Sequence, residues 1–86
     1  MARKRIIPNT CGKRIKMARV GRDMKQVDLA AAVSVDSHVE MDQNVISAIE
    51  RGVRHVKDIE LLAFCDALGV KPLWLMFGDD VPEKYR

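Results

Sequence analysis

Apolar residues recur along most of the chain at spacings of three and four positions, the period of an amphipathic helix, whereas strand-like alternation is rare. Glycines separate the successive apolar segments at four places: Gly21, Gly52, Gly69 and Gly78. Glycine readily takes the left-handed backbone conformation that follows the last turn of a helix, so each of these positions is expected to end one. The pattern therefore predicts an all-α chain.

The first two helices precede the middle of the chain. Asn9 or Thr10 is a suitable N-cap for a first helix that ends at the first glycine. A second helix is expected over about 25–33. Lys25 is a poor N-cap for it and Asp23 is the alternative, and the residues leave open which of the two serves.

The start of the third helix has two candidates. Ser37 and Glu40 have the spacing of a capping box, which would start the helix early. Asp42 is an equally suitable N-cap for a shorter helix. We favour a loop or short turn over 34–41 and a regular helix over about 42–51. Its inward face is expected to be Val45, Ile46 and Ile49.

The last two helices are expected over 58–68 and 72–77. Asp58 and Glu60 stabilise the start of the first of these through the helix dipole. Pro72 opens the other, because proline is well tolerated in the first turn of a helix. Five short helices are therefore expected in all.

The 86 residues suit one domain, and their 48% of hydrophobic residues is too high for a disordered chain. We expect a basic flexible arm over 1–9, a helical domain over 10–78 and a polar tail over 79–86. No signal peptide or membrane-spanning run is visible, so a cytoplasmic location is expected.

The residues that carry catalysis or bind metals are sparse. Cys11 and Cys65 lie far apart, without the paired spacing of a zinc site, and reduced structural thiols are favoured over a disulfide. His38 and His55 stand in different contexts. The chain has neither a phosphate-binding loop nor a recognisable catalytic arrangement. We therefore expect no enzyme activity, no metal and no cofactor.

Charge is distributed unevenly along the chain. Residues 1–25 carry nine Lys or Arg and one Asp, residues 26–50 carry five acids and no Lys or Arg, and residues 51–86 carry six of each sign. A basic end attracts phosphate backbones in a salt-dependent way. A merely solvated face explains the same distribution, so charge alone does not decide the function.

Several short motifs follow one another in a definite order. They are Gly12-Lys13-Arg14-Ile15, Ala18-Arg19, Gln26-x-x-Leu29-Ala30, Ile46-Ser47-Ala48-Ile49-Glu50-Arg51-Gly52, Glu60-Leu61-Leu62-Ala63, Ala67-Leu68-Gly69-Val70 and Trp74-Leu75. In this order the chain resembles the lambda-repressor-like, or XRE-type, helix-turn-helix family over roughly 12–78. The resemblance implies a compact five-helix DNA-binding domain whose recognition helix is the one over about 42–51.

A recognition helix presents its first turn to base edges in the major groove. Gln43 and Asn44 occupy that turn, and both side chains can pair bidentately with adenine. Ser47 and Ala48 follow one turn later, where serine can pair with several bases and alanine offers a methyl contact to thymine. These four residues are the predicted base-reading set, against the alternative of a solvated helix face.

Phosphate contacts are expected from positions around this helix. The resemblance implies such a contact for Gln26, at the start of the second helix. Three basic residues follow the recognition helix and are expected to reach phosphates: Arg51, Arg54 and Lys57. Three basic residues of the arm resemble arms that reach around DNA, although a solubilising tail is the alternative: Arg3, Lys4 and Arg5.

The resemblance also implies an ion pair between Arg19 and Glu50, joining the first and third helices. The chain departs from the usual pattern in the longer segment over 36–42, and Ser34 replaces the turn glycine common in the family. This insertion resembles a variant of the family with a longer turn, although its acidic residues would repel phosphate if they faced DNA.

Two functions follow from these observations. The first is sequence-specific binding of double-stranded DNA as a small transcriptional regulator, expected to be a homodimeric repressor of prokaryotic or phage origin. The alternative is a protein-interaction module, such as the antitoxin of a toxin pair, that binds its partner through the acidic 36–42 insertion.

Overall fold

The structure is a computed structural model that describes residues 9–36 and 39–86. The helices are α1 (Gly12–Gly21), α2 (Gln26–Asp36), α3 (Gln43–Glu50), α4 (Asp58–Leu68) and α5 (Pro72–Phe77), followed by a 3-10 turn at Glu83–Tyr85. No strand occurs among these residues, so the all-α prediction is confirmed. The predicted phosphate contacts in the arm and the alternative cap Ser37 lie outside the described residues.

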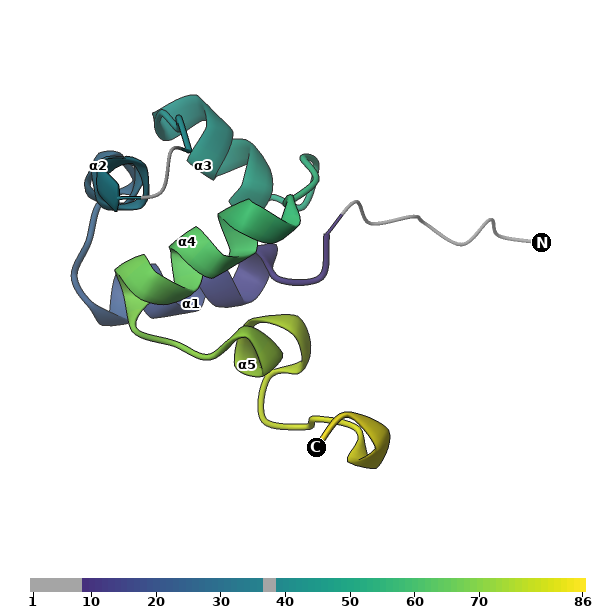
Figure 1. The fold of residues 1–86 in the computed structure, drawn as a ribbon. Coiled ribbons are helices and arrows are strands. Elements are labelled where there is room, and N and C mark those ends of the chain that lie inside the picture. Colours follow the sequence, from purple (N-terminus) through teal and green to yellow (C-terminus); the bar gives the residue numbers. More distant parts are fainter. Residues whose placement is uncertain (1–8, 37–38) are drawn as a thin grey trace.

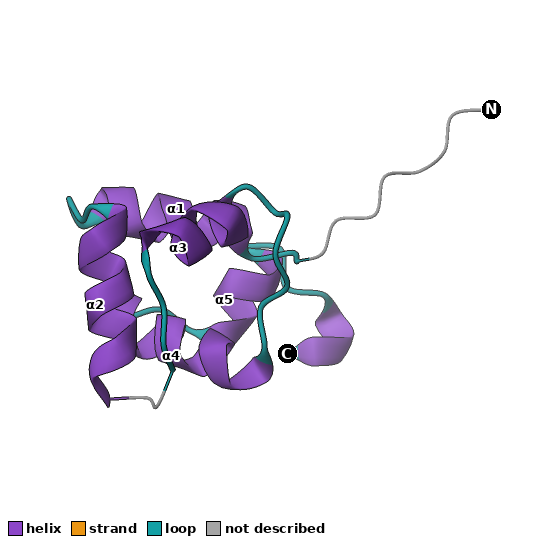
Figure 2. Cartoon of the chain, turned by 90° about the horizontal axis from the view of Figure 1, so that it is seen from above, coloured by secondary structure: helices purple, strands orange, loops and turns teal. Residues whose placement is uncertain are grey.

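The helices enclose one core (Figure 1). In Figure 1, α2 is seen nearly end-on, whereas α1 and α4 run across the view. Figure 2 shows α2 along its length, so α2 crosses α1 and α4 steeply. Helix α4 packs against α1, α2 and α5, and α3 packs against α1 and α2. This arrangement leaves one side of α3 open to solvent.

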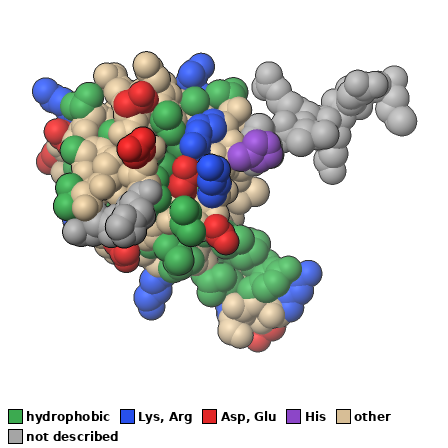
Figure 3. Space-filling view, turned by 45° about the horizontal axis from the view of Figure 1, so that its top comes forward, with side chains coloured by type: hydrophobic (Ala, Val, Ile, Leu, Met, Phe, Trp, Pro, Cys, Tyr) green, Lys and Arg blue, Asp and Glu red, His purple; other side chains and the backbone are tan. Residues whose placement is uncertain are grey.

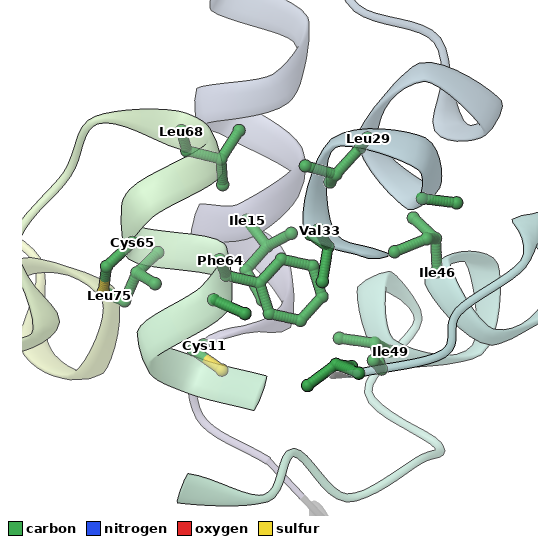
Figure 4. Close-up of a cluster of buried hydrophobic side chains, with 13 residues drawn as sticks. Cys11, Ile15, Leu29, Val33, Ile46, Ile49, Phe64, Cys65, Leu68 and Leu75 are labelled. Atoms are coloured by element: carbon green, nitrogen blue, oxygen red, sulfur yellow. The ribbon is translucent and has the colours of Figure 1, made fainter. Parts of the chain in front are cut away.

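The core is built from side chains of all five helices (Figure 4). Phe64 of α4 lies at its centre, beside Ile15 of α1 and Val33 of α2. Ile46 and Ile49 of α3 are completely buried, as their spacing predicts. A buried aliphatic side chain contributes roughly 1.5–3 kcal/mol to stability, so these two residues fix which face of α3 is turned inward.

Gly52 and Gly69 follow α3 and α4 with φ angles of 78° and 67°, as predicted. The prediction for Gly21 is wrong in detail: α1 includes Gly21, and the left-handed residue of the following turn is Asp23, with φ 56°. Aspartate tolerates this conformation better than most residues. At the start of α2, the backbone N–H of Lys25 donates to the Asp28 carboxylate at 2.9 Å.

Helix α2 runs three residues past its predicted end, so the expectation of a loop from Ser34 onward is wrong there. The Ser34 hydroxyl donates to the Ala30 carbonyl oxygen at 2.8 Å and accepts from the Met41 N–H at 3.2 Å. The Ser34 hydroxyl therefore bonds both to its own helix and to the segment that leads to α3, at the position where the family commonly has a turn glycine. Val39, in the same connection, is buried in the core.

The C-terminal segment is partly ordered by aromatic contact. The rings of Phe77 and Tyr85 are stacked with their centroids 5.3 Å apart. Leu75 is completely buried and Trp74 packs against the core, while Met76 remains 40% exposed.

Candidate nucleic-acid interface

The first turn of α3 is fixed by a side-chain cap. Asp42 has extended backbone angles, and its carboxylate accepts from the Val45 N–H at 2.9 Å. Residues 39–42 are not helical, so the start at Asp42 is the correct one of the two predicted. Gln43 and Asn44 follow the cap, and both are exposed.

The exposed side of α3 is polar. Ser47 and Ala48 are half-buried one turn beyond the exposed first turn, while Ile46 and Ile49 point into the core. The four residues predicted to read bases therefore all retain solvent access. Together they offer amide donors and acceptors, a hydroxyl and a methyl group. Base edges in the major groove can form hydrogen bonds with the polar groups and make apolar contact with the methyl group.

The end of α3 is held by a buried ion pair. Arg19 of α1 meets Glu50 in a bidentate arrangement, with its Nε 2.6 Å from Oε2 and its Nη2 3.0 Å from Oε1. The hydrogen bond to Glu50 raises the pKa of the Arg19 guanidinium above its ordinary value. Arg19 also donates to the Met24 carbonyl oxygen at 2.8 Å. The pair that the family resemblance implies thus connects α1, the turn after it and α3.

Gln26 belongs to the same network. Its side-chain amide donates to Glu50 Oε1 at 3.1 Å, so the start of α2 is joined to the end of α3. A glutamine amide carries two N–H donors, and the bond to Glu50 uses one of them. The residue that the resemblance assigns to phosphate is therefore already oriented by the protein.

The loop over 51–57 carries the three basic residues predicted to reach phosphates. Arg51 and Lys57 are exposed. Arg54 instead forms a bidentate pair with Glu60 of α4, at 2.9 and 3.0 Å, and donates to the His55 carbonyl oxygen. Its charge is thus matched inside the protein.

Glu60 is buried at the start of α4. Burial alone would raise the pKa of its carboxyl group, but hydrogen bonds from Arg54 and from the Lys57 N–H outweigh burial and hold that pKa below its ordinary value. Sequence reasoning assigned Glu60 only to the helix dipole. The spacing between Lys57 and Glu60, that of an N-cap and the third residue of a helix, is the signal that could have shown its second role.

The basic side chains of α1 and of Arg22, the residue that follows it, lie in different surroundings. The guanidinium groups of Arg14 and Arg22 lie against Gly78 and Gly69, the residues that follow α5 and α4. The negative end of a helix dipole stabilises a cation there. Lys13 and Lys16 are exposed. The two arginines therefore lie beside the ends of other helices, whereas the two lysines face solvent.

The prediction of Asn9 or Thr10 as the N-cap of the first helix is wrong in detail, because the N-cap residue of α1 is Cys11. The side-chain oxygen of Asn9 accepts from the Gly12 N–H at 2.8 Å, and its amide group donates to the Ile49 and Arg54 carbonyl oxygens. These partners lie 40 and 45 positions away. No local pattern indicates a contact over that separation.

On the face that Figure 3 shows, acidic and basic side chains lie interspersed, without one continuous basic field. Among the described residues, no group of three or more His, Cys, Asp or Glu side chains is placed to hold a metal ion. Cys11 and Cys65 are buried free thiols, and burial raises the pKa of both. No helix among the residues that the structure describes has both the length and the apolar character to cross a membrane.

Comparison with known proteins gives two matches. The family model described as helix-turn-helix matches residues 15–75. The HTH-type transcriptional regulator PrtR of Pseudomonas aeruginosa is 34% identical over 77 residues, which cover 90% of this chain and 27% of that protein. No solved structure matches the chain significantly.

Proposed function

The chain belongs to the helix-turn-helix family, and on that premise we propose that it regulates transcription by binding double-stranded DNA in a sequence-specific manner. The observation that carries the proposal is the exposed polar start of α3, a helix whose other end is held by the network of Arg19, Gln26 and Glu50. A reading helix must be held rigidly, because its side chains have to meet base edges at hydrogen-bond distance.

Gln43 and Asn44 are the proposed base-reading residues of the first turn. Both are exposed, and their amide groups can pair with the N6 and N7 atoms of adenine. Ser47 and Ala48 lie one turn further on and would contact bases by a hydroxyl and a methyl group. Because α3 carries no Lys or Arg, it serves to recognise bases, and the electrostatic attraction to phosphates comes from residues outside it.

Phosphate contact is assigned to residues around α3. Gln26 lies at the N-terminus of α2, where backbone N–H groups favour an anion. Arg51 and Lys57 supply exposed charge after α3. The basic arm residues Arg3, Lys4 and Arg5 are proposed to add to this attraction. We assign Arg54 to the ion pair with Glu60 instead, since its guanidinium already has a carboxylate partner.

We further propose that the regulator is a homodimeric repressor. A dimer reads two half-sites about one helical turn apart, which multiplies the small specificity of one short helix. Hydrophobic side chains gather over the C-terminal end of the molecule (Figure 3), and Leu73, Met76 and Tyr85 are among the exposed ones. Such a patch is suited to a second copy of the chain. The relative PrtR is named a transcriptional regulator.

Selection of duplexes from a random pool, followed by sequencing, tests DNA recognition directly. The chain is expected to enrich a defined motif. Gln43→Ala and Asn44→Ala are then expected to alter base preference at particular positions, by about 1–3 kcal/mol for each bidentate pair removed. Asp66→Ala, at an exposed position of α4, is the matched control. Failure to enrich any duplex at low salt would refute the proposal.

Sedimentation of the chain with Met76→Asp tests the dimer. The wild-type chain is expected to bind a two-half-site duplex as a dimer, and the variant to bind one half-site more weakly. Transcription from a promoter that carries the selected motif should fall when the chain is expressed. A rise in transcription would overturn the assignment as a repressor.

A further inference from the structure

We propose that Asn9 is a positioning residue for DNA binding, which sets the place of the phosphate-contacting loop over 51–57 relative to α3. The inference rests on the proposed function and adds to it a residue outside the reading helix. Asn9 closely precedes the first helix, and among the described residues its side-chain amide links that point to the loop after α3.

The Asn9 side chain uses both of its polar groups in the interior. Asn9 is only 9% exposed. Its carbonyl oxygen accepts from the Gly12 N–H at 2.8 Å, and its amide nitrogen donates to the carbonyl oxygens of Ile49 and Arg54 at 3.1 and 2.8 Å. Because a backbone N–H can only donate and a carbonyl can only accept, these three partners admit one orientation of the amide.

The bond to Ile49 lies at the C-terminal end of α3. The last carbonyl groups of a helix lack partners within the helix. The Ile49 carbonyl oxygen accepts from the Gly52 N–H at 2.9 Å, and the Asn9 amide is a second donor to it from another part of the chain. Gly12 allows the approach, because a Cβ atom at that position would overlap the Ile49 carbonyl oxygen. The start of α1 and the end of α3 are therefore in direct backbone contact, with Asn9 beside them.

The bond to Arg54 fixes the middle of the loop. The backbone carbonyl of Arg54 is held by Asn9, and its guanidinium is held by Glu60, which also accepts from the Lys57 N–H. The two attachments act on opposite ends of one residue. The exposed cations on either side of it, Arg51 and Lys57, thus project from a loop whose backbone is held in place.

Removal of the two amide donors would take this partner from the Ile49 and Arg54 carbonyl groups and release the middle of the loop at Arg54, whereas the first residues of the loop stay bonded to α3 through the Gly52 and Val53 N–H groups. Phosphate contacts fix the register of a protein on DNA, and a hydrogen bond weakens steeply when its geometry departs from the ideal. The expected effect is therefore that the loop binds fewer phosphates, while the base-reading residues of α3 are unchanged.

Asn9→Ser is the test variant. Serine keeps a side-chain acceptor for the Gly12 N–H, but its short side chain does not extend to both carbonyl oxygens. The measurement is fluorescence anisotropy with a labelled mixed-sequence duplex over a salt series. We expect affinity to fall about tenfold and the slope of log K against log salt to become shallower by about 0.9 for each phosphate that the loop no longer binds. Thr10→Ala, at the exposed neighbouring position, is the control and should match the wild type.

A merely structural role would lower the melting temperature of Asn9→Ser and leave the salt slope unchanged in the folded variant, which would overturn the inference. Asn9→Asp is isosteric, keeps the acceptor and has no donor at neutral pH, so it is measured if the serine variant does not fold. Failure of both to fold would also overturn it, by assigning Asn9 to stability alone. If the wild type itself binds no duplex, the proposed function fails; an unchanged slope in a binding-competent variant refutes only the role of Asn9.

Discussion

Replacement of Glu50 by alanine removes the acceptor at the centre of the network that joins α1, α2 and α3. Breaking a buried ion pair from one side typically costs about 3–5 kcal/mol, because the remaining charge stays buried without its partner. We expect the lower end, about 3 kcal/mol. Arg19 keeps its hydrogen bond to the Met24 carbonyl oxygen, and its side chain remains 11% exposed to water.

For a domain of this size each kcal/mol shifts the melting temperature by about 4–8 °C, so Glu50→Ala should melt about 12–24 °C below the wild type. Circular dichroism at neutral pH measures this shift. The stability expected for a chain of this length is about 4–13 kcal/mol, so the variant should remain folded in the cold.

A double-mutant cycle with Arg19→Met separates the pair from its surroundings. Because alanine at position 50 and methionine at position 19 remove both charges together, the double variant should be more stable than the sum of the single effects predicts, by about 2 kcal/mol. Additive effects, or a cost below about 1 kcal/mol for Glu50→Ala, would refute the interpretation of the pair as a buried structural link.

Three further outcomes are expected. Asp42→Ala, which removes the cap of α3, should cost about 1 kcal/mol in urea unfolding and weaken sequence-specific binding; Asp42→Asn, which keeps an acceptor, should cost much less, and equal costs would contradict the capping role. The pKa of Glu60 lies below its ordinary value of 4.5, so its pairing with Arg54 stabilises the folded state above that pH, and this stabilisation is lost as the pH falls below it. Glu60→Gln should flatten this part of the plot of unfolding free energy against pH, and an unchanged plot would count against the pair. Cys11 and Cys65 should react with iodoacetamide far more slowly in the folded protein than in urea, since burial raises the pKa of both thiols; equal rates would show that the thiols are accessible.

Local signals are sufficient for the helices of the second half of the chain. The bounds of α4 and α5 agree with prediction, because an acidic first turn, a proline and glycines mark their ends. The inward face of α3 likewise follows from its spacing. Two starts of α3 are compatible with the sequence, and the hydrogen bond from the Val45 N–H to the Asp42 carboxylate explains which of them occurs.

The errors occur where contacts between distant segments decide the structure. Helix α2 continues through Ser34 because the serine hydroxyl bonds both to its own helix and to Met41. The positive charge of α1 is visible in the sequence, but the direction of each side chain is not, and Arg14 and Arg22 lie at the ends of other helices. The partners of Asn9 likewise depend on how the helices pack.

Val39 anchors the described part of the connection between α2 and α3 in the core, although its neighbour Glu40 is exposed. A longer connection costs little additional chain entropy, and burial of one valine, worth roughly 1.5–3 kcal/mol, more than offsets that cost. The segment from Val39 to Met41 should then open only when the whole domain opens. The Met41 amide hydrogen, held by Ser34, should accordingly exchange with solvent at the rate of global unfolding. We therefore expect α2 and α3 to open together with the segment around Val39, as one cooperative unit.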